Sequence, residues 1–303
     1  MMSRKSKTSK PLTLPFLIAG VVVLWGSSFV LSKFALEEIG AVTLAFYRWC
    51  FATAFLLLFL GSRGQLGEAR AMVKGDPGFF AFLGFVGVSL FYTLQNLGLK
   101  YSTAINVGIL ININPLLIAI LSAFILNERL DLTKALGIVV AFAGVCLITL
   151  NEGPIQLASR RLVGDLLTLL SALCWAIYSV WGKRALARHE PLLVTSVAAG
   201  FGTIFLLPMA LWEGMALLPS VQTWLLVALL GIFSGALAYL FWYAILERME
   251  ASRAAVYLFL IPVYSTALAI LALGEPITLK IVIGAILIIS GVFAAQAGGK
   301  AVR

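Results

Sequence analysis

Apolar segments separated by short polar connections make up almost the whole chain. A helix needs about 20 mostly apolar residues to cross a bilayer, and ten segments reach or approach that length. They are residues 12–34, 41–60, 78–99, 102–126, 132–150, 165–186, 192–212, 222–246, 251–273 and 277–297. The connections contain glycine, proline or charged residues, and the longest are 61–77 and 151–164. The pattern predicts an all-α membrane protein with ten transmembrane helices.

The block from residue 84 to residue 144 occurs a second time, 147 residues later and without a gap. The matched pairs are Gly84 and Gly231, Tyr92 and Tyr239, Leu99 and Leu246, Pro115 and Pro262, Glu128 and Glu275, Gly137 and Gly284, and Gly144 and Gly291. The first two segments of each half align less tightly. Trp25 lies 150 residues before Trp175, and Val42-Thr43 lies 152 before Val194-Thr195. Such a duplication in an apolar chain indicates a membrane protein with its site between the halves.

Each half, residues 12–150 and residues 165–297, holds five predicted spans. An odd number of spans makes the second half enter the membrane with the opposite orientation. The chain is therefore predicted to form two inverted five-helix repeats. In this architecture a site near the bilayer midplane can open alternately to the two faces.

The composition excludes a soluble protein. Hydrophobic residues make up 61% of the chain and charged residues 12%, and the mean hydropathy is +1.04. A soluble domain of 303 residues could not cover so much apolar surface with so few charges. Lipid is therefore the expected solvent along most of the length.

The net charge of +9 could suggest nucleic acid as a partner, but the Lys and Arg residues sit in short loops without stacking aromatic residues. We interpret them as orientation signals. Sixteen of the 22 fall on one predicted side of the membrane and five on the other, while Arg48 lies inside a span. Cytoplasmic loops carry the excess of positive residues. The tails 1–11 and 298–303 are therefore both predicted to be cytoplasmic, in a multi-pass protein of the cell inner membrane.

The residues that carry catalysis or bind metals are missing from the apolar segments. His189 is the only histidine, and Cys50, Cys146 and Cys174 have no Cys-x-x-Cys spacing. We expect no catalytic residue, no metal and no cofactor, so the chain is not predicted to be an enzyme. No Asp or Glu lies in the middle of a span. This disfavours a cationic substrate held by a buried carboxylate and favours a neutral or zwitterionic metabolite.

Several short motifs resemble one known family. They are Leu24-Trp25-Gly26-Ser27-Ser28-Phe29 with Lys33, Arg48 early in the second span, Pro115 followed by Asn127-Glu128-Arg129-Leu130, and Pro262 followed by Gly274-Glu275-Pro276. The chain resembles the EamA branch of the drug/metabolite transporter superfamily over nearly its whole length. The resemblance implies ten helices, two inverted repeats and a central cavity. Members of that superfamily include exporters of amino acids, aromatic amino acids among them, and of other metabolites.

A polar stripe is predicted on the third span. It consists of residues three and four apart, Ser89, Tyr92, Gln95 and Asn96. Polar side chains are costly against lipid, so this face is expected to point into the bundle or a wet cavity. The corresponding residues of the eighth span are Ala236, Tyr239, Trp242 and Tyr243. We predict that the two stripes line the substrate cavity; the alternative is hydrogen bonding and aromatic packing between helices.

The first and sixth spans supply a second pair of predicted cavity walls. Trp25 and Trp175 occupy related positions well inside their spans, which argues against anchoring at the lipid headgroups. Ser28 accompanies Trp25, and Tyr178 accompanies Trp175. The alternative is that these residues simply pack in the core.

Two prolines are expected to kink the fourth and ninth spans. Asn106 lies two turns before Pro115, and Tyr257 lies near Pro262. Freed backbone carbonyls at such kinks can meet substrate, so Asn106 and Tyr257 are candidate binding residues. The prolines can equally serve helix shape alone.

Arg48 is the one strong charge predicted inside a span. It could bind a substrate carboxylate by a bidentate contact. It could also snorkel, since it lies only about two turns from the outer end of its helix. Glu128 and Glu275 follow the fourth and ninth spans, and we interpret them as helix caps or loop anchors.

These observations predict an integral membrane transporter that exports amino acids or related small metabolites by alternating access. Transport of other metabolites or drugs, such as nucleosides or amphipathic compounds, is one alternative. A non-transporting receptor or structural membrane protein is another. The expected partners are the small-molecule substrate and the lipid bilayer. The substrate, the coupling ion, the direction of flux and the oligomeric state are left open by the sequence.

Overall fold

The computed structural model describes residues 13–150, 161–215, 219–273 and 276–297. The predicted cytoplasmic tails, most of the connection between the halves, and Glu275 lie outside these residues. Everything with regular structure in the described ranges is helical, as predicted. The first-half elements are α1 (Leu14–Ala35), α2 (Ala41–Ser62), α3 (Leu66–Gly75), α4 (Pro77–Gly84), η1 (Phe85–Leu90), α5 (Phe91–Tyr101), α6 (Ala104–Ile111), α7 (Asn114–Ile125) and α8 (Leu132–Thr149).

The described residues of the second half follow the same order and show no counterpart of α3. Its elements are α9 (Leu162–Ala185), α10 (Pro191–Glu213), α11 (Val221–Leu229), η3 (Leu230–Leu237), α12 (Ala238–Arg248), α13 (Ala251–Val256), η4 (Tyr257–Phe259), α14 (Leu260–Leu273) and α15 (Leu279–Ala297). Proline opens several helices, for example Pro77 in α4 and Pro191 in α10. The first helical position suits proline because its missing N–H would have no partner there.

Nine helical stretches in the described part of the chain are long and apolar enough to cross a membrane. The apolar part of α1 that can be assessed, Leu14–Ser28, is shorter. Large apolar side chains cover the outside of the bundle, including Phe124, Trp212 and Phe293, which are 80%, 92% and 72% exposed. Only lipid can solvate such a surface at low cost, so the chain is a helical membrane protein.

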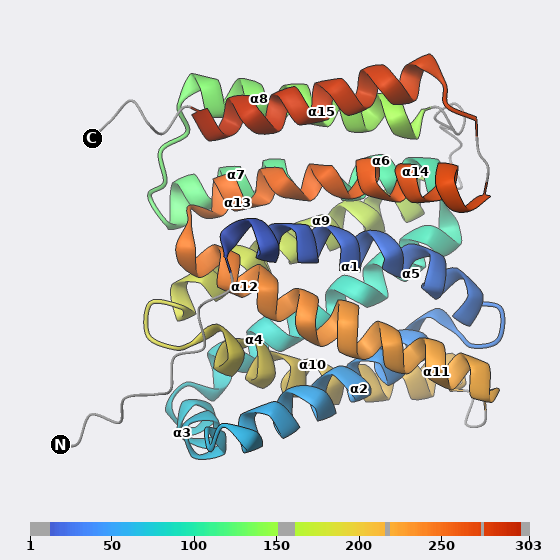
Figure 1. The fold of residues 1–303 in the computed structure, drawn as a ribbon. Helices are drawn as coiled ribbons and strands as arrows, with labels where there is room; N and C mark the ends of the chain where they lie inside the picture. The colour runs from blue at the N-terminus through green and yellow to red at the C-terminus, as the bar shows by residue number, and fades with distance from the viewer. Residues whose placement is uncertain (1–12, 151–160, 216–218, 274–275, 298–303) are drawn as a thin grey trace.

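The connection 61–77 contains a helix, α3, that the sequence pattern did not predict. This helix is amphipathic and buries Ala69 and Met72 against the main core. It contains three charged residues, Glu68, Arg70 and Lys74, and they hid its apolar face in a search for membrane spans. It lies beside α4 and α10 at one corner of the bundle (Figure 1).

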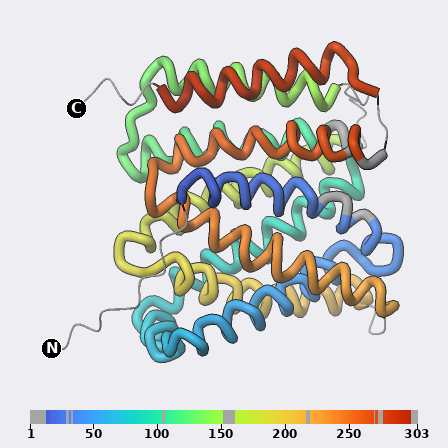
Figure 2. Tube along the Cα trace, in the orientation of Figure 1, coloured from blue at the N-terminus to red at the C-terminus, as the bar shows by residue number. Residues whose placement is uncertain are grey.

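The helices run roughly parallel or antiparallel to one another, in layers (Figure 1). The pair α8 and α15 forms one outer layer, α1 lies near the centre, and α2 and α10 lie at the opposite edge. In the tube view, α1 begins and α15 ends at the same end of the bundle (Figure 2).

The pair α8 and α15 is held together by glycines at very short range. A Cβ added to Gly137 would lie 2.6 Å from the Gly291 carbonyl oxygen, and one added to Gly144 would lie 2.6 Å from the Gly284 oxygen. The higher-numbered glycine of one helix meets the lower-numbered glycine of the other, so the two helices are antiparallel. Because glycine has no side chain, the two backbones can touch.

Two further glycine contacts, one in each half, show which residues of the two halves correspond. Gly84 of α4 packs on the Ala198 carbonyl of α10, and Gly231 packs on the Arg48 carbonyl of α2. The glycines are 147 residues apart, but their partners are 150 apart. The starts of α2 and α10, Ala41 and Pro191, also differ by 150. The predicted alignment of Val42-Thr43 with Val194-Thr195 is therefore wrong by two residues, because it relied on a chance dipeptide identity.

The fourth and ninth spans are interrupted at equivalent places. In the first half, α6 ends at Ile111 and α7 begins at Asn114, next to Pro115. In the second half, the short 3₁₀ segment η4 separates α13 from α14, which contains Pro262. Proline cannot donate a backbone hydrogen bond and displaces the preceding turn, so the expected breaks form.

Two π-helical segments were not foreseen. They are η1 and η3, at equivalent positions in the third and eighth spans. Each contains the first residue of a predicted stripe, Ser89 or Ala236, and precedes the rest of it. A π-helical turn shifts the backbone hydrogen-bond pattern by one residue, and such turns occur frequently at functional sites.

Candidate transport site

Nine aromatic side chains from five helices meet at the centre of the bundle, and we call them the aromatic cluster. They are Trp25 of α1, Trp49 of α2, Phe91 and Tyr92 of α5, Trp175 and Tyr178 of α9, and Tyr239, Trp242 and Tyr243 of α12. The rings of the repeat-related Trp25 and Trp175 lie 5.1 Å apart, edge to face. Edge-to-face pairs are a favoured arrangement of aromatic rings.

Most predicted wall residues therefore lie together. Tyr92 and Tyr239, the matched tyrosines of the two stripes, both pack on Trp49, at ring distances of 5.9 and 4.7 Å. Tyr178 stacks on Tyr243 at 4.9 Å. All the cluster side chains are buried except Trp25, which is half-buried. In this conformation the rings fill the centre against one another, so their role as cavity walls stays a prediction.

The two π-helical segments hold the cluster in place through backbone carbonyls. The Trp25 indole donates a hydrogen bond to the Ser234 oxygen in η3 at 3.0 Å. The Tyr239 hydroxyl donates one to the Gly87 oxygen in η1 at 3.3 Å. Gly87 and Ser234 are 147 residues apart, so the same position in each half contributes the acceptor.

Small residues make room for the rings. A Cβ on Gly87 would collide with the Tyr178 ring, and one on Gly182 would collide with Tyr243. Trp242 also donates from its indole to the Ser179 hydroxyl at 3.1 Å, and Tyr243 donates to the Tyr178 carbonyl at 3.3 Å. These contacts fix the ring orientations with little polar surface left over.

Arg48 lies in the interior beside the cluster. Only 6% of the residue is exposed, and its guanidinium carbon lies 4.9 Å from the centre of the Tyr92 ring. The snorkelling interpretation is therefore wrong. The sequence could not reveal this, because the cover comes from α5 and η3. The neighbouring Trp49 was missed altogether, and its only signal was its place next to Arg48.

Four predicted site residues are placed differently. Ser28 donates to the Trp25 carbonyl on its own helix at 2.7 Å. Asn96 donates to the Ala41 carbonyl at 2.8 Å and so ties α5 to the start of α2. Asn106 donates to Asp165 at 3.1 and 3.2 Å, which joins α6 to α9. These three serve helix contacts, and Gln95 is half-buried on α5 outside the ring contacts.

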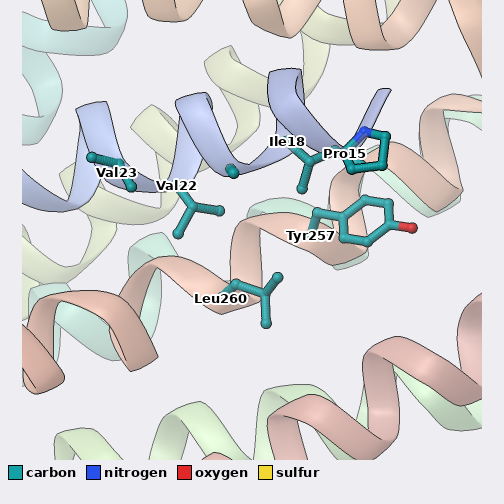
Figure 3. A pocket seen from close by; sticks show the side chains of 7 residues that line it. Pro15, Ile18, Val22, Val23, Tyr257 and Leu260 are labelled. Atoms are coloured by element: carbon teal, nitrogen blue, oxygen red, sulfur yellow. The ribbon is translucent and has the colours of Figure 1, made fainter. Parts of the chain in front are cut away.

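Tyr257 lies away from the aromatic cluster. It lines an apolar hollow of about 410 Å³ between the first half of α1 and the start of α14. Figure 3 shows Tyr257 and Leu260 on one side and Pro15, Ile18 and Val22 on the other, with the tyrosine hydroxyl directed away from Val22.

Carboxylates tie the helices together at one end of the bundle. Glu128 accepts hydrogen bonds from the Ala251 and Ser252 backbone N–H groups at the start of α13, and pairs with Lys183 at 3.2 Å. The predicted capping role of Glu128 is thus confirmed. Burial opposes its ionisation, but the hydrogen bonds from Ser252 and the Lys183 charge together hold the pKa of Glu128 below its ordinary value. Lys134 pairs with Glu250 nearby at 2.8 Å.

Other carboxylates do the same at the opposite end. Glu213 of α10 accepts from the Val42 and Thr43 backbone N–H groups at 3.0 and 2.7 Å, which caps α2. Glu38 accepts from the Thr223 and Ser220 hydroxyls at the start of α11, and these hydrogen bonds lower the pKa of Glu38. Negative charge at a helix N-terminus is favourable because the free N–H groups point toward it.

Within the described residues, no group of three or more His, Cys, Asp or Glu side chains could hold a metal ion. The chemistry at the centre is therefore that of aromatic surfaces, a few hydroxyl and indole donors, and one guanidinium. Such a surface suits recognition of a small organic molecule.

Comparison with known proteins agrees with this geometry. The model of the EamA-like transporter family matches residues 13–150 and 162–295. A solved crystal structure that is 22% identical in sequence has the same fold, with a TM-score of 0.82 over 95% of this chain and 97% of the other.

Relatives in bacteria and archaea are named as transporters. One from Archaeoglobus fulgidus, an uncharacterized transporter, is 34% identical over 91% of this chain and 96% of its own length. A probable terminal-alkyne amino-acid exporter from Streptantibioticus cattleyicolor is 30% identical over 88% of this chain and 87% of its own. These names indicate a transporter rather than an enzyme. The chain belongs to the EamA-like transporter family, within the drug/metabolite transporter superfamily, and is a multi-pass membrane transporter of a small molecule.

Proposed function

We propose that the protein exports amino acids, or closely related zwitterionic metabolites, across the cell inner membrane by alternating access. The observation that carries the proposal is the aromatic cluster, in which matched rings of the two halves meet at the centre of the bundle. The likeness to an amino-acid exporter over most of both chains supports the same class of substrate.

Contacts between matched residues support an inverted relation of the halves. Trp25 faces Trp175, and Thr53 hydrogen-bonds Thr203, its mate 150 residues later, at 2.8 Å. At the other edge, Gly137 meets Gly291 while their respective mates, Gly284 and Gly144, meet each other, which is the exchange that a two-fold axis produces. A residue can contact its repeat-related counterpart only near a two-fold axis that relates the two halves. Because α8 and α15 are antiparallel, this axis runs perpendicular to the helices. An axis of this kind in the membrane plane supports our proposal of two inverted five-helix repeats with ten spans. The excess of Lys and Arg in the loops on one side supports cytoplasmic tails.

The alternating opening of the transporter depends on the contacts that join the two halves at each end of the bundle. Glu128 and Lys183 close one end, while Glu38 and Glu213 close the other. Alternating access requires one set of ties to open while the other holds. The breaks beside Pro115 and Pro262 provide places where two helices can bend, because backbone hydrogen bonds are already interrupted there.

The substrate class follows from the cluster's chemistry. Its side chains are aromatic with a few neutral donors, and no carboxylate lies among them to hold a free cation. Rings that separate during opening would expose flat apolar surface for an apolar or aromatic substrate side chain. We propose Trp25, Tyr92, Trp175 and Tyr239 as the main contacts.

The direct test is counterflow of labelled amino acids in proteoliposomes that contain the purified protein. We expect saturable exchange of aromatic or large apolar amino acids. Trp175→Phe should keep the fold and weaken exchange severalfold, while Trp212→Phe, on the lipid face, should match the wild type.

Exchange of nucleosides or amphipathic compounds without any amino acid would overturn the substrate assignment and keep the transporter. If no compound from these classes moves, while ligand binding persists, the receptor alternative gains support.

A further inference from the structure

Two neighbouring residues of α2 carry buried hydrogen-bond donors that nothing satisfies. Among the described residues, Arg48 Nε and Trp49 Nε1 are buried side-chain nitrogens without a partner. Arg48 is 6% exposed and Trp49 is fully buried. A buried donor without an acceptor is costly, and buried polar groups are nearly always paired. Two such donors on adjacent residues indicate that an acceptor binds there in another state of the protein.

Both donors belong to the edge of the aromatic cluster. The Arg48 guanidinium lies over the Tyr92 ring, and the Trp49 ring lies 5.9 Å from that of Tyr92. Gly235 of η3 adjoins Arg48, since a Cβ placed there would lie 3.9 Å from Arg48 Nε. A group that reaches these donors would therefore have the proposed aromatic site beside it.

The charge of the missing acceptor can be inferred. None of the three ion pairs found in the described part of the chain involves Arg48. A cationic side chain in the membrane interior normally faces an anion or a water-filled cavity. A carboxylate is planar and accepts hydrogen bonds from both kinds of donor, and guanidinium groups bind it with good geometry.

The second half has no such pair. Applying the 150-residue offset, Arg48 and Trp49 correspond to Ala198 and Ala199, which are buried and carry no donor. The duplication therefore offers one anion-binding place and not two. This matches a substrate with a single acidic group, bound in one orientation.

We propose that Arg48 Nε and Trp49 Nε1 bind the carboxylate of the transported substrate, beside Tyr92. The proposal rests on the proposed function and deepens it, because it requires a substrate with a carboxylate. The aromatic rings then take the apolar side chain.

The experiment compares phenylalanine with its carboxamide, which has the same ring and amino group but no carboxylate. Both compete for exchange of labelled phenylalanine in proteoliposomes. In the wild type we expect phenylalanine to compete at least about tenfold better, since charge-assisted hydrogen bonds are worth that much or more. Trp49→Phe and Arg48→Gln should each reduce this preference severalfold while leaving competition by the carboxamide nearly unchanged.

Matched control variants are Arg63→Gln, at the end of α2, and Trp212→Phe, on the lipid face. Both should keep the wild-type preference. Arg48→Lys keeps the charge but loses the planar donor fork, so it should fall between wild type and Arg48→Gln. If Arg48→Gln does not fold, Trp49→Phe and Arg48→Lys decide the question, because each keeps most of the original volume.

An unchanged preference for phenylalanine in Trp49→Phe and in the folded Arg48 variants would overturn this proposal alone. Equal competition by phenylalanine and its carboxamide in the wild type would also overturn it, with amino-acid transport intact. If the wild type exchanges no amino acid at all, the proposed function itself fails.

Discussion

The crossing of α8 and α15 and the aromatic cluster use the internal repeat in opposite ways. At the crossing, Gly137 and Gly144 in one half meet Gly291 and Gly284 in the other, so the same residues make the same contacts twice. In the cluster, positions are matched but chemistry is not. Arg48 and Trp49, beside the rings of the first half, correspond to the alanines Ala198 and Ala199 in the second. Symmetry is kept where backbones pack and is broken at the pair of residues that we propose for binding the substrate carboxylate.

Filling the crossing should have the largest effect. Gly144→Leu drives a side chain into the Gly284 carbonyl, and backbone in a packed helix pair cannot move away. We expect a loss of more than about 3 kcal/mol in stability, seen as loss of the monodisperse peak and a strongly lowered melting temperature in detergent. Gly200→Ala is the matched control, since a Cβ there meets nothing within 4 Å. Normal stability of Gly144→Leu would mean that the two backbones are not in contact.

Emptying the cluster should cost less. Trp175→Ala leaves a void among five rings. Because lipid is as apolar as the protein interior, little free energy of transfer is lost with the side chain. Most of the cost is therefore that of the cavity left behind. We expect the free energy of unfolding to fall by about 2 kcal/mol. The exchange rate should fall by more than in Trp175→Phe. Trp212→Ala, on a side chain that is 92% exposed, should change neither. Equal effects of the two variants would show that the rings do not form a packed centre.

Removing the charge of a capping carboxylate at one end of the bundle should cost less than either of these changes. Glu128→Gln keeps one acceptor for the start of α13 but loses the charge that pairs with Lys183, and should cost about 1 kcal/mol near neutral pH. Because the folded-state pKa of Glu128 lies below its ordinary 4.5, its stabilisation is complete above that value. It is lost as the pH falls through the lowered folded-state pKa.

The gap in melting temperature between wild type and Glu128→Gln should therefore be constant above about pH 5 and narrow below it. A gap that instead widens on acidification would contradict the capping role. Glu38→Gln provides a comparison at the other end, where the carboxylate is solvent-exposed, and should change stability less.

Some of this structure could be predicted from residues alone. The repeat offset of 147 and the two prolines can be read directly from the sequence. The helices recur in the same order in both halves, and the breaks in the fourth and ninth spans lie beside the prolines. The aromatic residues of the stripes were recognisable because helical spacing alone places them on one face. The carboxylate caps were partly visible, since Glu128 follows a span directly.

Other features depend on neighbours distant in sequence. Arg48 is near a helix end by count, yet α5 and η3 cover it, so burial could not be inferred from α2. Asn96 and Asn106 looked like cavity residues because polarity within a span is rare, but their partners are a carbonyl and a carboxylate on other helices. The π-helical segments have no residue signature, because they arise from how a helix fits its surroundings.

Those segments carry a consequence for how this site can vary. A π turn accommodates one more residue than an α turn, so everything after it is rotated by about 100° about the helix axis. The direction of Tyr92 and Tyr239 is thus set by a residue count upstream, in Phe85–Leu90 and Leu230–Leu237. Deleting a single residue there would turn the whole stripe toward a different neighbour without altering one side chain on it. For such a protein, changes in length within a helix are a route to new specificity as direct as substitutions in the site.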